Sequence, residues 1–286
     1  MTSILTNTSA MAALQTLRSV NTNLDTTQAR VSSGYRVGEA KDNVAYWSIS
    51  TTMNSDNKAL NAAADALGVG AAKVDTAYAG IESAIDVVNE IKAKLVTASE
   101  TSTDNDQIQL EIAKLQEQLT SIAEGASFNG ENWLTGKNTA DGDIDEGTVV
   151  DGFVREGGAV RVTTATVDLT EVILTGTGGL LESVLTIDAS TSTDLAGDLT
   201  TVETALAALN KAGATLGALS TRIDLQDNFA AKLSDSIESG VSRLVDADME
   251  EESAKLSALQ TQQQLAIQSL SIANSSTQNI LTLFRS

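Results

Sequence analysis

The chemistry open to this chain is limited by the residue types that it lacks. Its 286 residues include no histidine and no cysteine. Without cysteine there is no disulfide, no thiolate nucleophile and no thiolate zinc ligand, and without histidine the commonest general base and metal ligand is missing. We therefore expect no catalytic residues, no metal ion and no cofactor, so the sequence favours a protein that is not an enzyme.

Three segments still carry residue types that could bind an ion. The stretch 141–147 (DGDIDEG) has carboxylates at alternate positions, as calcium loops do. Its sixth position is Glu146 instead of glycine and its twelfth is Gly152 instead of glutamate, so a solvated acidic loop is favoured. The glycines of 176–179 lack the following lysine and hydroxyl residue of a phosphate loop, which indicates a turn. The acids at 246–252 fit charge at a helix entry better than a cation cluster.

Charge is distributed unevenly along the chain. Residues 1–34 carry +1 and residues 253–286 carry +2, so with a whole-chain charge of −20 the segment 35–252 holds −23. A pI near 4.2 argues against nucleic acid and anionic membranes as partners, because phosphate recognition needs clustered Lys and Arg. No segment approaches the ~20 apolar residues of a membrane span, and the first residues do not resemble a cleaved signal peptide.

Helical periodicity dominates both ends of the chain. Apolar residues recur at alternating spacings of three and four, with a few polar exceptions, which predicts a helix packed along a seam. The N-terminal seam is Ala10, Ala13, Leu17, Val20, Leu24, Thr27 and Val31, and its helix should stop near Ser33-Gly34. The C-terminal seam is Val245, Met249, Glu252, Leu256, Leu259, Gln263, Ala266, Leu270, Ala273, Thr277, Ile280 and Phe284.

The middle of the chain combines long helices with one change of texture. A third helix is expected from Ile108 to Gly125. Before it, a seam shifts register by one residue ahead of Ile91 and Leu95, after running through Leu60, Ala64, Leu67, Ala71, Val74, Tyr78, Ile81, Ile85 and Val88. Twelve of the 20 glycines lie between 125 and 197, among β-branched runs typical of strands and turns. Helical spacing resumes at residue 195 for a long helix.

This order predicts a mainly α fold with a small β-rich insert. We expect a coiled-coil-like bundle of long helices, N- and C-terminal helices that project together, and an outer α/β variable domain. The expected segments are 1–34 (N-terminal helix), 35–128 (bundle), 129–194 (insert), 195–244 (long bundle helix) and 245–286 (C-terminal helix).

The terminal helices favour self-association. They offer apolar stripes backed by uncharged polar residues, and alone they bury too little to offset the backbone entropy of about 1–2 kcal/mol per residue, so solitary helices should fray. The hypothesis is a polymer, with an intrachain stalk of the two helices as the alternative. A head-to-tail contact that does not close makes a helical filament. The residues expected to assemble are Leu14, Leu17, Leu24, Val31, Leu256, Leu259, Leu270, Ile280 and Phe284.

Several ordered blocks closely resemble bacterial flagellin. They are Ser33-Gly-Tyr-Arg-Val37, Ala40-Lys-Asp-Asn-Val44, Phe128-Asn-Gly130 with Trp133-Leu134, Ser242-Arg-Leu-Val-Asp-Ala-Asp-Met249 and Asn279-Ile-Leu-Thr-Leu-Phe-Arg285. The resemblance covers about 1–135 and 195–286, and residues 46–49 with the short insert look like flagellins of rhizobia and agrobacteria, which are alphaproteobacteria.

The resemblance implies a subunit of the extracellular flagellar filament used for swimming motility. It further implies type III export without a cleaved signal, homopolymerisation with sister flagellins as possible co-subunits, and contacts with hook-associated proteins, cap proteins and an export chaperone. The alternatives are a hook-filament junction protein or an adhesin displayed on the filament through residues 129–194.

The resemblance also places two immune epitopes on this sequence. In relatives detected by plants, the segment matching 29–50 is recognised, and here Asn43, Val44, Tyr46 and Trp47 depart from its usual pattern. Animal Toll-like receptor recognition uses an Arg and a Leu where this chain has Glu90 and Lys94. We therefore expect poor recognition by both receptors.

Overall fold

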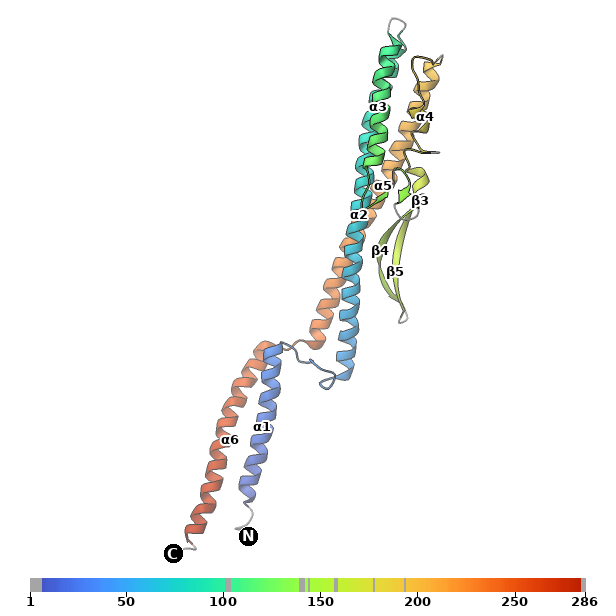
Figure 1. Cartoon of the computed structure of the whole chain (residues 1–286). Helices are drawn as coiled ribbons and strands as arrows, with labels where there is room; N and C mark the ends of the chain where they lie inside the picture. Colours follow the sequence, from blue (N-terminus) through green and yellow to red (C-terminus); the bar gives the residue numbers. More distant parts are fainter. Residues whose placement is uncertain are drawn as a thin grey trace. The chain divides into compact units, whose positions relative to one another are not determined.

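The computed structural model of the chain is mainly helical with a small amount of antiparallel sheet (Figure 1). It describes residues 7–100, 104–138, 142–143, 145–156, 159–176, 178–192 and 194–283. The chain forms two compact units, which we call the terminal unit (residues 1–55 and 236–286) and the central unit (residues 56–235). The terminal unit therefore combines segments from both ends of the sequence, whereas the central unit is one continuous segment.

The edges of the units differ from the segment boundaries expected at 34/35 and 244/245. Those positions instead mark helix ends, since α1 (Thr8–Ser33) stops there and α5 (Leu195–Val245) ends there. The units divide within the continuous helices α2 (Val44–Ala98) and α5. Helix ends can be inferred from local residue types, whereas the edge of a compact unit depends on long-range packing.

The terminal unit contains α1 and α6 (Met249–Leu283), which lie side by side (Figure 1). Asn7 caps the start of α1, because its side-chain oxygen accepts a hydrogen bond from the amide of Ala10 at 3.0 Å. Gly34 ends the helix with φ of 77° and donates its amide to Arg30 at 2.8 Å. A residue with a Cβ rarely adopts that conformation, so the predicted helix stop is confirmed with its physical cause.

Fraying of solitary terminal helices is not what the structure shows. Residues 8–33 and 249–283 are helical, and the two helices are paired within one chain, as in the stalk alternative. The expectation was wrong because it treated each helix as solitary, whereas a shared seam buries Val20, Thr27, Glu252 and Leu259.

The central unit is built on a heptad seam between α2, α3 (Asn105–Gly125) and α5. On α2 the seam positions, all buried, are Leu60, Ala63, Leu67, Gly70, Val74, Ala77, Ile81, Ala84, Val88, Ile91, Leu95 and Ala98. On α5 they are Val202, Ala205, Leu209, Ala212, Leu216, Leu219, Ile223 and Ala230. Spacings of three and four alternate on α2 from Leu60 to Ala98, which is the pattern of coiled-coil packing.

The register shift expected in α2 is therefore wrong. The expected seam includes Ala64, Ala71, Tyr78 and Ile85, which lie one residue beyond the buried small residues at 63, 70, 77 and 84. Ala and Gly fill these seam positions because α2 packs closely against its neighbours. Tyr78, which the expected seam places in the core, is 44% exposed.

The insert contains two small antiparallel sheets. Strands β1 (Glu131–Asn132), β2 (Lys137–Asn138) and β3 (Gly142–Asp143) form one sheet, and β4 (Glu146–Glu156) pairs with β5 (Ala159–Asp168) in a hairpin. A bulge interrupts the hairpin register between Val150 and Gly152. Strand structure thus ends at residue 168, within the β-rich insert expected over 129–194.

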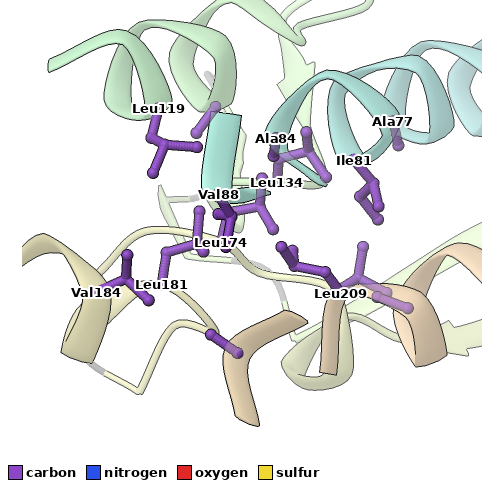
Figure 2. Packing of buried hydrophobic residues seen from close by; sticks show 14 of the residues in the cluster. Ala77, Ile81, Ala84, Val88, Leu119, Leu134, Leu174, Leu181, Val184 and Leu209 are labelled. Atoms are coloured by element: carbon purple, nitrogen blue, oxygen red, sulfur yellow. The ribbon is translucent and has the colours of Figure 1, made fainter. Parts of the chain in front are cut away.

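The remainder of the insert is a short 3-10 turn η1 (Leu169–Glu171), a one-turn helix α4 (Glu182–Leu185) and loops. Leu169, Val172, Leu174, Leu181 and Val184 are fully buried. Figure 2 shows Leu174, Leu181 and Val184 lying close to α2 and α5 side chains such as Val88 and Leu209. This part of the insert thus contributes its apolar side chains to the same core as the helices, without forming strands.

Candidate functional site

The facing surfaces of α1 and α6 form what we call the helix-pair seam. On α1 it consists of Ala10, Ala13, Leu17, Val20, Leu24, Thr27 and Val31, all buried or half-buried. On α6 it consists of Glu252, Leu256, Leu259, Gln263, Ala266, Leu270 and Ala273, also buried or half-buried. The predicted period of both terminal helices is confirmed over these positions.

Three polar contacts fix how α1 and α6 align. Near one end of the pair, Arg30 Nη1 donates to Glu252 Oε1 at 3.1 Å. In the middle, Gln263 Nε2 donates to Asn21 Oδ1 at 2.7 Å, and towards the chain termini Asn7 Nδ2 donates to the carbonyl of Ala273 at 2.9 Å. A seam of small and medium apolar residues specifies register weakly, so these spaced polar pairs supply it.

The turns that join the terminal helices to the rest of the chain are tied to each other. The amides of Arg36 and Val37 both donate to the carbonyl of Val245, at 2.7 and 3.1 Å, and the amide of Ala247 donates to the carbonyl of Gly34 at 2.9 Å. Val245 is the last residue of α5 and not the first of the C-terminal seam. The C-terminal helix begins at Met249, whose side chain is 44% exposed instead of lying in the seam.

Most residues expected in self-assembly lie in the helix-pair seam of one chain. Leu17, Leu24, Val31, Leu256, Leu259 and Leu270 are all on it. Leu14 lies off the seam and is 38% exposed. The side chain of Ile280 and the whole of Phe284 lie outside the part of the chain that the structure describes.

A second apolar stripe on α6, which we call the outer stripe, was missed by sequence reasoning. It comprises Ala254, Ala258, Leu265 and Ile272, all exposed. Ile272 follows Leu270 by two residues, a rotation of roughly 200° about the helix axis, so the outer stripe faces away from α1. Leu265 is 56% and Ile272 68% exposed. The seven-residue spacing of 258, 265 and 272 was the available signal.

The residues expected at the plant epitope lie at the start of α2. Asn43 caps this helix, since its Oδ1 accepts from the amides of Ala45 and Tyr46 at 3.1 Å. Val44 is 69% exposed, and Tyr46 and Trp47 are exposed as well. Large apolar side chains thus meet solvent at this helix end.

The residues expected at the animal epitope lie further along α2. Glu90 is exposed, and Lys94 forms an ion pair with Glu111 of α3. The hydrogen bond from Lys94 to Glu111, together with the charge of that carboxylate, raises the pKa of the Lys94 ammonium above its usual value. Lys94 therefore contributes to the α2–α3 contact as well as to the surface.

Over the described ranges, no group of three or more acidic side chains is arranged to hold a metal ion. Likewise, none of the helices within those ranges is long and apolar enough to cross a membrane. The candidate acidic loop 141–147 falls partly outside the described residues.

The chain has paired terminal helices with an exposed apolar stripe, and it also has a bundle of long helices with a small insert. These features are those of coiled-coil-like structural proteins. Two family models match this chain: the bacterial flagellin N-terminal helical region over residues 4–139 and the bacterial flagellin C-terminal helical region over residues 199–284. The chain belongs to the bacterial flagellin family. It is a structural subunit of the flagellar filament, the polymer used for swimming motility.

Relatives support the family along the whole chain. The sequence is 48% identical to flagellin C of Rhizobium meliloti (strain 1021) and 50% identical to a flagellin of Brucella melitensis biotype 1, in each case over 100% of both chains. The expected resemblance to rhizobial flagellins is thus confirmed. A putative flagellar hook-associated protein from Vibrio parahaemolyticus has a similar fold, with a TM-score of 0.50, 12% identity, and coverage of 72% of this chain and 100% of that chain.

Proposed function

We propose that α1 and α6 fold as a pair in each subunit and that the outer stripe of α6 joins subunits into the filament. The single observation that carries the proposal is that α6 has apolar stripes on opposite sides. One stripe is covered by α1, and the other, with Leu265 and Ile272, is exposed. A helix that is apolar on two faces is suited to a position between two other helices.

Charge supports the same arrangement. Copies with a net charge of −20 repel one another, so contacts are favoured where charge is absent. Residues 256–284 contain no charged side chain. The outer stripe therefore lies on one of the few surfaces where like-charged copies can approach closely.

The energy available from the outer stripe is sufficient for polymerisation to depend on it. Burying a Leu or Ile side chain contributes about 1.5–3 kcal/mol. Loss of both Leu265 and Ile272 should then cost about 3–6 kcal/mol per subunit, which corresponds to at least ~100-fold in the critical concentration.

The experiment compares Leu265→Ser/Ile272→Ser with Gln264→Ser/Gln268→Ser, a control that changes uncharged polar residues of the same helix. Seeded elongation is followed by light scattering and electron microscopy, and circular dichroism checks the helices of the monomer. We expect the first variant to stay monomeric with unchanged helix content and the control to elongate. Normal filaments from the first variant would exclude the outer stripe as a subunit contact.

The remaining assembly residues belong to the same proposal. Leu14 of α1, Ile280 and Phe284 are proposed to contact neighbouring copies, whereas Leu17, Leu24, Val31, Leu256, Leu259 and Leu270 act by holding α1 against α6. The subunit is proposed to be exported through the flagellar type III apparatus to the cell exterior. Its proposed partners are sister flagellins, hook-associated and cap proteins and an export chaperone. What supports these partners is membership of the flagellin family.

We propose, further, that receptors recognising other flagellins bind this chain poorly. The support is chemical: Glu90 and Lys94 replace the Arg and Leu implied by the resemblance, and bulky Tyr46 and Trp47 stand in the plant epitope. Glu90→Arg/Lys94→Leu should raise the response of Toll-like receptor reporter cells to purified monomer at least tenfold, while Glu82→Arg should not. Full activation by the unchanged monomer would contradict the proposal.

A further inference from the structure

A shallow groove lies on the surface of the central unit between α2 and α5. Tyr78, Ile81 and Ile85 of α2 line one side, and Gly213, Ala214 and Gly217 of α5 line the other. Small residues on α5 leave the space open, and Tyr78 remains 44% exposed beside it. The groove holds about 270 Å³, slightly below the usual range of small-molecule sites of about 300–1,000 Å³ and suitable for protein side chains.

An exposed apolar ridge lies on the same helix, α5. Leu225 is 67% and Phe229 61% exposed, and a spacing of four residues places both on one face. From Gly217 to Leu225 the helix turns by roughly 80° and rises by roughly 12 Å. The ridge and the groove therefore occupy neighbouring parts of the α5 surface but cannot meet within one chain.

Charge at the two features is complementary. Glu82 is exposed at the groove, and Lys232 is exposed one helical turn beyond Phe229. Within the described ranges, neither side chain forms an ion pair, although most other lysines of the central unit do. An acid beside the groove and a base beside the ridge would meet when one copy inserts its ridge into the groove of the next.

We propose that the occupant of the groove is the ridge of a second copy of this chain, with Phe229 and Leu225 covering Tyr78 and with Lys232 paired to Glu82. The inference rests on the proposed self-assembly and adds a contact made by the central unit. Because ridge and groove are different surfaces, the contact is heterologous and propagates from copy to copy instead of closing a dimer. Because each copy carries a large excess of acidic residues, one pair of opposite charges favours this alignment of ridge and groove over other alignments.

The absence of cysteine permits a direct test by disulfide formation. In Tyr78→Cys/Phe229→Cys, the two positions of one chain are roughly 20 Å or more apart along α5, too far for a disulfide, which needs Cα atoms within about 7 Å. Oxidised filaments of this variant should therefore give a ladder of covalent trimers and longer species on non-reducing gels. Each single variant, and the control Tyr78→Cys/Leu110→Cys with an exposed position on α3, should give none.

The outcomes distinguish the ridge-and-groove contact from the proposed filament function. Filaments without a ladder overturn the ridge-and-groove contact and leave the filament function standing. A ladder from Phe229→Cys alone overturns it as well, because that result requires a self-complementary contact. If the unsubstituted chain forms no filaments under seeding, the proposed function itself fails.

Charge reversal gives a second measurement that needs no cysteine. Lys232→Glu and Glu82→Lys should each raise the critical concentration for elongation at least threefold, and the combined variant should return it to within twofold of the unsubstituted protein. Lys137→Glu, an exposed change elsewhere in the central unit, is the control. Additive losses in the combined variant would show that the two side chains do not meet and would overturn the pairing.

Discussion

At the scale of single residues, Asn132 connects the insert to the helices. Its Nδ2 donates to the carbonyls of Ala123 and Glu124 at 2.8 and 3.2 Å, and its Oδ1 accepts from the amides of Leu134 and Thr135 at 2.9 and 3.1 Å. The side chain is 7% exposed. It therefore satisfies both the last carbonyls of α3 and the turn that positions Trp133 and Leu134 in the core.

We predict that Asn132→Ala lowers the free energy of unfolding of the central unit by about 3 kcal/mol, because several buried backbone groups lose their partner. Urea titration with Trp133 fluorescence measures the change. Asn228→Ala, which removes one exposed hydrogen bond, should cost less than about 0.5 kcal/mol. Equal losses from the two variants would contradict this role for Asn132.

Asp42 gives a prediction for pH. Its carboxylate accepts hydrogen bonds from the amides of Glu39 and Gly38, each at 3.1 Å, and these bonds lower its pKa below the ordinary 3.8. The stabilisation of this turn is thus present above pH 3.8 and is lost as pH falls through the lowered pKa of the folded state. Carboxyl NMR should give a midpoint below 3.8 for Asp42, and a midpoint above 3.8 would exclude these bonds in solution.

At the scale of elements, the alternation of large and small residues lets α2 pack closely in the central unit. Large residues such as Leu67 and Val88 alternate with Ala77 and Ala84 along a strict heptad. Gly80 is equally constrained, since a Cβ at this position would lie 3.1 Å from the Cβ of Ala126 and closer still to Leu134. Close packing of α2 against its neighbours, the insert included, therefore depends on these small residues as well as on the larger ones.

We predict that Ala84→Leu destabilises the central unit by about 1–3 kcal/mol through overpacking, since Ala84 is fully buried. Ala93→Leu makes the same change at an exposed position of α2 and should cost less than about 0.5 kcal/mol. Thermal and urea unfolding of the two variants, compared side by side, measure this difference. A neutral Ala84→Leu would mean that α2 packs more loosely than the seam implies.

At the scale of the whole molecule, charge opposes assembly and the uncharged surfaces allow it. A net charge of −20 on each copy produces repulsion that added salt screens, with a Debye length of about 30 Å at 0.01 M and about 8 Å at 0.15 M. The exposed apolar residues of the outer stripe and of the ridge carry no charge. Assembly should therefore be governed by apolar contacts and limited by long-range repulsion.

We expect the critical concentration for seeded elongation to fall at least threefold when sodium chloride is raised from about 10 to about 150 mM. Sedimentation of filaments at several salt concentrations measures it. Leu265→Ser/Ile272→Ser should remain monomeric across the whole range, because screening does not replace lost apolar area. A critical concentration that rises with salt would indicate that attractive ion pairs dominate assembly.

The sequence alone determined the elements whose signals are local and periodic. The seam of α1, the stop at Gly34, the break before α3 and the helical restart at Leu195 all follow from residue types a few positions apart. The tertiary structure decided which periodic positions become buried. On α2 the alanines, and not Tyr78, face the core, and on α6 Leu265 stays exposed while Leu259 is covered, because burial depends on where neighbouring helices lie and not on hydrophobicity alone.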